Sequence, residues 1–191
     1  GSAIRFSHIS KIFGGVRALD NVSFDVGLGE VHCLAGENGS GKSTLIKIIA
    51  GVYQPESGAV MEYFGKQDAH ITPHLARAHG IAVIWQDLAL FGEMTVAENI
   101  AFETLVGGKP RLVNYGRIET LAREALRKLG VELDLAASLN TLPIAQRQLV
   151  AIARALVSDA RLIFMDEPTA SLTQAETDKL LGVVRTLSAS G

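Results

Sequence analysis

The nine residues from Gly36 to Thr44 have the types and the spacing that bind phosphate. They consist of a glycine, four further residues and then Gly-Lys-Ser-Thr, the pattern of a phosphate-binding P-loop. The three glycines, Gly36, Gly39 and Gly41, allow a tight turn with inward-pointing N–H groups, and a helix starting near Lys42 adds its positive dipole end. Lys42 can reach the β- and γ-phosphates, Ser43 can offer its hydroxyl to Mg²⁺, and Thr44 can contact the α/β-phosphates. A glycine-rich turn without a ligand would not need Lys, Ser and Thr at the helix start.

The chain on either side of this loop predicts the strand–loop–helix context that the motif needs. Residues 31–35 are mostly apolar and predict a strand, and residues 45–51 predict a helix. Cys33, the only cysteine, lies within the expected strand, so we expect it to be a small buried hydrophobic side chain. A single cysteine excludes a disulfide within the chain.

Two more apolar runs end in polar side chains that suit chemistry beside a phosphate. Residues 161–165 predict a buried strand that ends at Asp166 and Glu167. There, Asp166 can hold Mg²⁺ and Glu167 can orient or deprotonate an attacking water; the alternative is a solvated strand end. Residues 81–85 likewise predict a buried strand, which ends at Gln86. Open α/β sheets bind ligands at such ends, although spacing alone favours a surface loop residue at Gln86.

The remaining patterns predict strands before the loop and helices after residue 87. Alternation at residues 4–6 and 22–26, around Gly14-Gly15, indicates antiparallel strands, and residues 59–65 predict another. Phe13 could stack on an adenine ring, or it could belong to the core. Apolar residues at three- and four-residue spacing predict three helices. The first covers residues 118–129 and is capped by Gly130, the second follows Pro143, and the third follows a capping box formed by Thr173 and Glu176. Residues 107–110 predict a loop.

Composition limits the class of protein. The 191 residues are 48% hydrophobic and 20% charged, with 18 basic and 20 acidic side chains, which gives a formal net charge of −2. This balance argues against a nucleic-acid or anionic-membrane partner. No apolar stretch reaches the roughly 18 residues of a membrane span, so we expect a protein of the cytoplasm.

The order of these motifs resembles the nucleotide-binding subunit of ABC transporters. The shared order is a P-loop, Gln86 ending a strand, a helical insert, a Leu-Pro-Ile-Ala-Gln segment at residues 142–146, then Asp166-Glu167 and Ser171-Leu172-Thr173. The resemblance implies an α/β fold: a P-loop NTPase core with a mixed, mainly parallel sheet flanked by helices, an antiparallel β subdomain and an inserted α-helical subdomain. We set Gly1-Ser2 aside as tag-derived and expect one incomplete domain over 3–191. Residues 3–86 and 158–191 would form its core and 87–157 its helical subdomain.

By this resemblance the ligands are ATP and Mg²⁺. Phe13 would stack on adenine, Lys42 and Glu167 would be catalytic, and Ser43, Gln86 and Asp166 would hold the metal. The expected nucleotide-binding residues are Phe13, Gly36, Glu37, Asn38, Gly39, Ser40, Gly41, Lys42, Ser43, Thr44, Gln86, Pro143, Ile144, Ala145 and Gln146, the last four acting on the ATP of an opposite subunit.

Segments 51–58, 95–100 and 144–150 are similar to the ATPases of bacterial monosaccharide importers, which implies a sugar or related carbohydrate as cargo. The implied partners are a second ABC domain, fused or identical and arranged head to tail, membrane permease subunits and, indirectly, a periplasmic substrate-binding protein. Nucleic acid is not among them. The protein would be cytoplasmic and peripheral on the inner face of the cell membrane, and this chain would be a truncated amino-terminal half.

Two departures from the family pattern keep other functions open. Pro143 replaces the usual signature serine and so removes a hydroxyl and a backbone N–H. All five histidines precede Gln86, so the family's switch histidine is missing, which we attribute to truncation. Both departures favour a non-catalytic, ATP-gated module as the alternative. An ABC ATPase of DNA repair or translation is disfavoured by the near-neutral charge, and a kinase by the lack of an evident acceptor site.

Overall fold

The computed structural model describes residues 1–37, 39–68, 70–106 and 114–190. The chain divides into two compact units, one over residues 1–83 and the other over residues 84–190, and each is described by itself. The expected division at residues 86 and 157 stays a prediction. None of the described helices has both the length and the apolarity needed to cross a membrane.

A four-stranded antiparallel sheet forms the first unit, with strand order β2-β1-β3-β4. β1 (Ser2–Phe13) pairs with β2 (Val16–Gly27) and with β3 (Val60–Tyr63), and β3 pairs with β4 (Lys66–Gln67). Gly14 and Gly15 both have positive φ and make the β1–β2 turn. The antiparallel strands expected from alternation are thus confirmed, and β1 includes Ser2.

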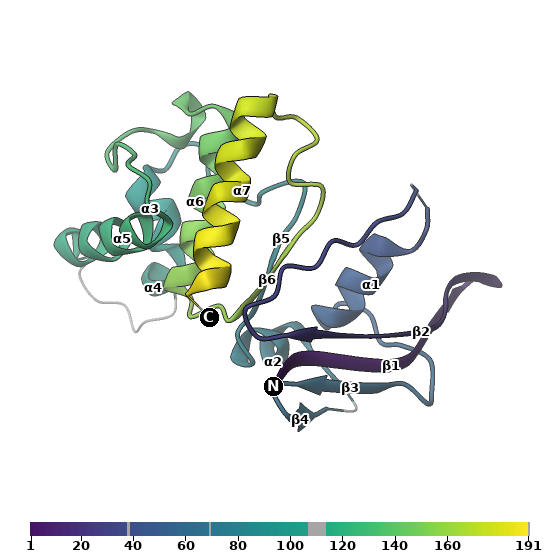
Figure 1. The fold of residues 1–191 in the computed structure, drawn as a ribbon. Helices are drawn as coiled ribbons and strands as arrows, with labels where there is room; N and C mark the ends of the chain where they lie inside the picture. Colours follow the sequence, from purple (N-terminus) through teal and green to yellow (C-terminus); the bar gives the residue numbers. More distant parts are fainter. Residues whose placement is uncertain (38, 69, 107–113, 191) are drawn as a thin grey trace. The chain divides into compact units, whose positions relative to one another are not determined.

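Two helices belong to the same unit. α1 (Lys42–Ile49) lies beside the sheet (Figure 1), and its apolar side buries Leu45, Ile46, Ile48 and Ile49. α2 (Pro73–Ala78) begins at Thr72, whose hydroxyl accepts from the Leu75 amide at 3.2 Å. Tyr63 is fully buried, with its ring edge-on to Phe6 and stacked on His79. β5 (Ile81–Ile84) lies at the boundary between the two units.

Helices dominate the second unit. They are α3 (Val96–Ile100), α4 (Phe102–Val106), α5 (Tyr115–Leu129), the 3₁₀ helix η1 (Leu139–Thr141), α6 (Ile144–Val157) and α7 (Gln174–Ala189), with strand β6 (Leu162–Met165) between α6 and α7. Their apolar faces meet in one core that includes Val96, Ile100, Ala122, Val150 and Ile152. The helical layer expected after residue 87 is therefore present.

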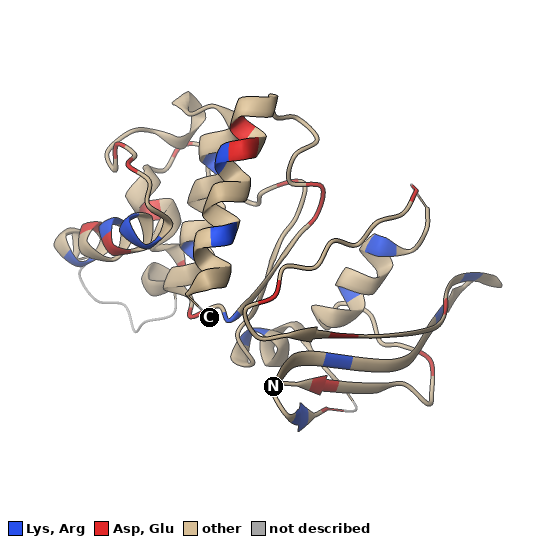
Figure 2. Ribbon diagram, viewed as in Figure 1, with Lys and Arg blue, Asp and Glu red and all other residues tan. Residues whose placement is uncertain are grey.

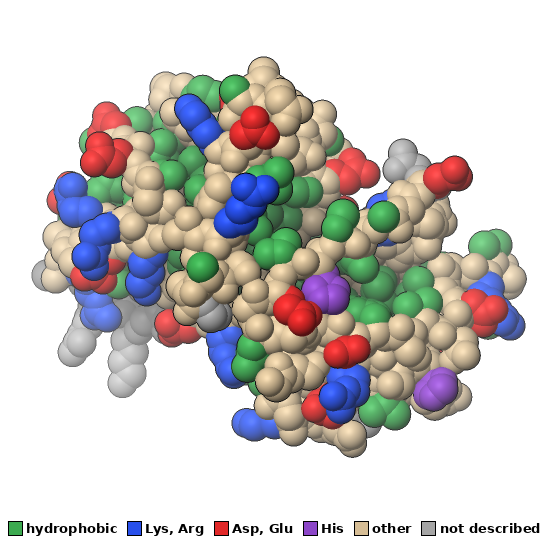
Figure 3. All heavy atoms as spheres, viewed as in Figure 1, with side chains coloured by type: hydrophobic (Ala, Val, Ile, Leu, Met, Phe, Trp, Pro, Cys, Tyr) green, Lys and Arg blue, Asp and Glu red, His purple; other side chains and the backbone are tan. Residues whose placement is uncertain are grey.

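Local sequence signals account for the helix ends. α5 ends at Gly130, whose left-handed φ of 67° only glycine adopts without cost, as predicted. α7 begins with the expected capping box, in which Thr173 and Glu176 satisfy each other's amides. Residues of both charge signs occur along α5 (Figure 2), and the side chains of Glu119 and Arg123 form an ion pair at 3.7 Å. Both signs also occur on each unit in the space-filling view (Figure 3).

Three expectations differ from the structure or fall outside it. Residues 31–35 form no strand, and Cys33 is exposed rather than buried, because an apolar run becomes a strand only where a neighbour completes its hydrogen bonds. β6 and the middle of β5 are half-buried rather than fully covered. The loop expected at 107–110 lies outside the described residues.

Candidate functional site: a phosphate loop and an acidic cavity

Backbone geometry at the phosphate loop depends on glycine. Gly41, the residue before α1, has φ 92°, and a Cβ there would lie 2.5 Å from the Ala18 carbonyl oxygen. Gly39 has φ 89°, and a Cβ at Gly36 would lie 2.5 Å from Ser40 Oγ. The loop therefore excludes side chains at two of these positions by contact and disfavours one at the third by backbone strain. This close wrapping is what a backbone cradle for phosphate requires.

The start of α1 supplies unpaired donors to this cradle. No side chain of the described residues caps the helix, and its first turn contains no acidic residue. The amides of Lys42, Ser43 and Thr44 therefore have no intrahelical partner and lie at the positive end of the dipole. An anionic ligand can satisfy all three at once. Glu37 and Ser40 close the loop through an amide-to-carbonyl bond of 3.1 Å, and Asn38 lies outside the described residues.

Lys42 bends back over the loop. Its ammonium donates to the carbonyl oxygens of Gly36 and Glu37, the latter at 3.0 Å. A cation held by two neutral carbonyls keeps most of its attraction for a phosphate. Binding would therefore exchange these bonds for stronger, charge-assisted ones. The residues present fit a nucleotide phosphate, and the binding role expected from their spacing stays a prediction.

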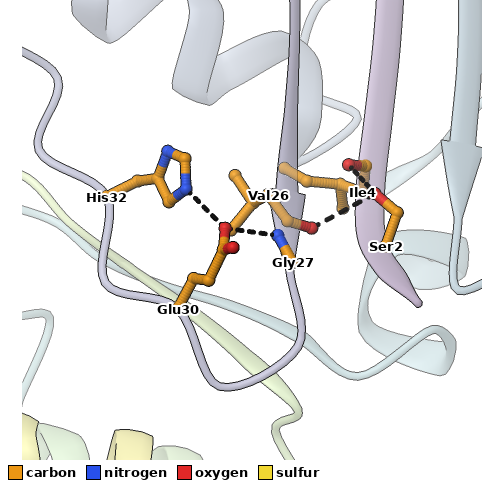
Figure 4. Close-up of polar contacts among 6 residues, drawn as sticks. All are labelled: Ser2, Ile4, Val26, Gly27, Glu30 and His32. Atoms are coloured by element: carbon orange, nitrogen blue, oxygen red, sulfur yellow. Dashed lines mark hydrogen bonds and ion pairs between the residues drawn. The ribbon is translucent and has the colours of Figure 1, made fainter.

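Glu30 makes two polar contacts, here called the Glu30 clamp, in the segment that precedes the phosphate loop. Glu30 Oε2 accepts from the Gly27 amide at 2.8 Å and lies 2.7 Å from His32 Nε2 (Figure 4). The Gly27 hydrogen bond and, secondly, the His32 bond hold the pKa of Glu30 below its usual value. In the same view Ser2 Oγ donates to the carbonyls of Ile4 and Val26. The Glu30 clamp connects Gly27, at the end of β2, to His32 in the segment at 31–35, which belongs to no strand.

Phe13 lies at the end of β1 and is 41% exposed, so it is not a core residue. Its ring makes an edge contact with Tyr53, with centroids 5.2 Å apart, and Lys11 Nζ lies 5.4 Å from its centroid. An exposed ring with a partner behind it is available for stacking. Adenine stacking at Phe13 stays a prediction, and Tyr53 is an aromatic neighbour that the sequence reasoning missed.

In the second unit, one small cavity brings together Gln86 and Glu167. The residues that line it come from the end of β5, from α6, from the end of β6 and from α7: Ile84, Trp85, Gln86, Leu88, Gln148, Ile152, Met165, Glu167, Pro168 and Leu180. Asp166 is half-buried beside it, and its amide donates to the Ile84 carbonyl at 2.9 Å. Gln86 is thus exposed at the surface and part of the candidate site at the same time.

Glu167 has an unusual backbone conformation. Its φ is 46°, in the left-handed region, and the next residue is Pro168. A non-glycine residue in this region costs about 1–2 kcal/mol, and a following proline further restricts the backbone. The carboxylate itself is exposed. Backbone strain at a carboxylate that lines a cavity is typical of functional positions, where the surroundings hold the chain in place.

The segment at residues 142–146 opens α6. Pro143 is the N-cap, without a side-chain cap bond, and Ile144 and Gln146 are exposed. Arg147 Nε donates to the Leu142 carbonyl at 2.8 Å and so fixes the chain entering the helix. The first amides of an α-helix have no intrahelical partner, and the exposed start of α6 leaves them accessible to another molecule. The binding role predicted for Pro143, Ile144, Ala145 and Gln146 stays a prediction.

The metal role predicted for Ser43, Gln86 and Asp166 also stays a prediction, since Ser43 belongs to the first unit and the other two to the second. Among the described residues, no three His, Cys, Asp or Glu side chains gather in a way that could hold a metal ion. Oxygen donors from hydroxyl, amide and carboxylate nevertheless suit Mg²⁺, which commonly takes few protein ligands and keeps the rest for water and phosphate.

Comparison with protein families matches the ABC transporter family over residues 19–170. The chain is 48% identical, over 194 aligned positions, to the arabinose import ATP-binding protein AraG 1 of Burkholderia ambifaria, covering 100% of this chain and 37% of that protein. It is 50% identical over 188 positions to the ribose import ATP-binding protein RbsA 2 of Streptomyces avermitilis, covering 96% of this chain and 36% of that protein. The chain thus spans about a third of the length of these relatives.

Solved structures show the same fold. The ADP conformation of MJ1267, an ATP-binding cassette of an ABC transporter, covers 100% of this chain and 78% of its own, with a TM-score of 0.88 and 29% identity. A nucleotide-free ATP-binding cassette from an ABC transporter covers 100% and 79%, with a TM-score of 0.87 and the same identity. The α/β cassette fold expected from the order of the motifs is confirmed.

Proposed function

Because this chain belongs to the ABC transporter family, we propose that it binds and hydrolyses ATP to energise the import of a sugar or related carbohydrate. The observation that carries the ATPase proposal is the glycine-dependent cradle with Lys42 folded over it. The cargo class is supported by the arabinose and ribose import proteins that the chain resembles along its length.

The proposal assigns chemical tasks to residues of both candidate sites. The amides from Gly39 to Thr44 and the Lys42 ammonium bind the β- and γ-phosphates, while Phe13 stacks on adenine. Ser43, Gln86 and Asp166 would hold Mg²⁺, which when bound would neutralise charge on the phosphates. Glu167 orients the attacking water and accepts its proton, a role that suits an exposed carboxylate beside Gln86.

The exposed start of α6 supports a partner on the other side of the ATP. Pro143 to Gln146 would cover the γ-phosphate held by a second ABC domain arranged head to tail. Membrane permease subunits and, through them, a periplasmic substrate-binding protein complete the proposed importer. The chain would then work in the cytoplasm, peripheral to the inner face of the membrane. Its charge balance gives no basis for nucleic-acid binding.

A second candidate function rests on Pro143. As the N-cap of α6 it supplies neither a side-chain hydroxyl nor an N–H, so the site that it completes has two fewer donors for the γ-phosphate. Such a site would bind ATP and gate the assembly of the two domains while another site hydrolyses. Both candidate functions require ATP binding, and only the ATPase requires ATP hydrolysis at this site.

The test measures MgATP binding with a fluorescent ATP analogue and turnover by phosphate release. Both are measured on residues 1–191 and on the longest natural polypeptide that contains them. Lys42→Ala should abolish binding, whereas Lys66→Ala, an exposed lysine on β4 in the same unit, should not. Glu167→Gln should bind ATP normally and lose about 10²–10⁴-fold in turnover.

The possible outcomes are distinct. Binding that survives Lys42→Ala would contradict the phosphate site itself. Normal turnover in Glu167→Gln would remove Glu167 from the role of base. ATP binding without turnover in either form of the wild-type protein would favour the gating module over the ATPase.

A further inference from the structure

Gln148 is a buried amide in α6 to which the proposed function gives no task. Only 8% of its surface is exposed, and within the described residues Asn99 is the one other buried polar side chain. Asn99 uses both ends of its amide, accepting from the Phe91 amide and donating to three carbonyls. Gln148, by contrast, donates from Nε2 to the Pro168 carbonyl, while its buried Oε1 has no partner. Burying a half-satisfied amide costs free energy, so its presence needs a reason.

The bond from Gln148 reaches the residue that follows Glu167. Since the proline ring fixes φ of Pro168, the direction of the Pro168 carbonyl defines the remaining backbone angle there. On the other side of Glu167, the Asp166 amide is held by the Ile84 carbonyl at 2.9 Å. The strained, left-handed Glu167 therefore lies between two anchored peptide groups, one of which is held by Gln148.

We propose that Gln148 is a positioning residue for ATP hydrolysis, which holds the Pro168 carbonyl and thereby keeps Glu167 in its left-handed conformation at the cavity. This inference rests on the proposed function, because it assigns a support to the base named there. Gln148 itself lines the same cavity as Gln86 and Glu167. Its unpartnered Oε1 is the acceptor left for a donor in this cavity, such as the Gln86 amide or a water.

Gln148 lies close to the exposed start of α6. It lies one helical turn after Ile144, in the helix whose exposed start carries the segment at residues 143–146. A molecule that binds this start and shifts the helix would move Gln148 with it. The Pro168 carbonyl would follow through the hydrogen bond, so binding at one end of α6 would reach Glu167 within the same chain.

The experiment replaces Gln148 by Met, which keeps the length of the side chain and removes both hydrogen-bonding groups. Gln148→Leu, which also removes both hydrogen-bonding groups but with a shorter side chain, is the second variant should the first fail to fold, and the same results are expected of it. Gln54→Met is the matched control, because Gln54 also donates from Nε2 to a carbonyl, that of Ile71, and also has a buried, unpartnered Oε1. Gln54 belongs to the first unit and is not among the residues that line the cavity.

Three readouts separate positioning from general stability: turnover and ATP affinity in the longest natural polypeptide, and amide hydrogen exchange of residues 166–172 without nucleotide. Gln148→Met should lower kcat at least about tenfold, as a displaced catalytic group does, with the Kd for ATP within about twofold. Exchange in 166–172 should become faster. Gln54→Met should change neither kcat nor exchange in this segment.

Two results would overturn the inference: unchanged kcat and exchange in Gln148→Met, or an equal fall of kcat in Gln54→Met, which would indicate general destabilisation. Failure of the proposed function gives a different result. If Glu167→Gln keeps normal turnover, the base is wrongly assigned; if Glu167→Gln is inactive and Gln148→Met is fully active, only the positioning role fails.

Discussion

Replacing Glu167 by glycine should stabilise the protein while removing its proposed base. At φ 46° a side chain costs about 1–2 kcal/mol, and glycine releases this strain. Glycine also makes the unfolded chain more flexible, which costs about 0.4–1 kcal/mol. The exposed carboxylate has no hydrogen bond or ion pair with the described residues that the substitution would lose. The net change is a gain of about 0.5–1 kcal/mol, or about 1–4 °C in the melting temperature of a chain of this size.

Trp85 offers a local assay for this change. It is the only tryptophan and lines the same cavity as Glu167, so its fluorescence during urea or thermal unfolding reports the second unit. Glu132→Gly is the matched control, since Glu132 is an exposed glutamate of that unit whose φ is not positive. The control should lose about 0.4–1 kcal/mol through the unfolded chain. The difference between the two variants measures the strain, about 1–2 kcal/mol.

An equal loss of stability in the two variants would refute the argument, because no strain would then be stored at Glu167. A gain for Glu167→Gly that equals the gain for Glu167→Gln would refute it as well. Glutamine keeps the side chain and therefore the strain, so the charge rather than the backbone would be the cause.

Three further predictions concern stability and pH. Burial and, secondly, the Asp68 charge raise the pKa of Tyr63. The stability that Tyr63 contributes is therefore fully present below the unfolded pKa of about 10 and is lost as the pH rises from there through the folded value. Circular dichroism should show a smaller alkaline fall in stability for Tyr63→Phe than for Tyr115→Phe. The lowered pKa of Glu30 contributes stability that is present above the unfolded pKa of about 4.3 and is lost as the pH falls through the folded value, so Glu30→Gln should weaken the acid-side fall in melting temperature. Asn99→Ala should cost about 1–3 kcal/mol in urea unfolding, because the Phe91 amide, which now donates to it at 2.8 Å, loses its acceptor; a smaller cost would show that water replaces the side chain.

Much of the candidate site follows from short stretches of sequence. The glycines of the phosphate loop need no distant contact to be recognised, because their spacing alone allows the tight turn that precedes α1. The Thr173–Glu176 capping box and Gly130 likewise act within one or two helical turns, and both lie at helix ends as expected. Such signals are readable because cause and effect lie within a few residues of each other.

The sequence carries a weaker local signal for Gln148. This residue precedes Ile152 by four residues and so shares the buried face of α6, where a polar side chain needs a partner. The pattern could therefore indicate that Gln148 is buried and bonded. It could not name Pro168, which is 20 residues away and comes close only when β6 and α6 pack in one unit.

By itself, then, the sequence determined the motifs, their order, the helix caps and the family fold, since each of these depends on neighbouring residues and on the periodicity of apolar positions. Only the tertiary structure decided that residues 31–35 are exposed, that Glu167 adopts a left-handed conformation, and that Gln86 and Glu167 share a cavity. The physical reason is the same in each case. A strand, a strained backbone angle or a cavity exists only where segments far apart in the chain supply or withhold hydrogen bonds and packing, and a local pattern specifies which face is apolar but not which partner meets it.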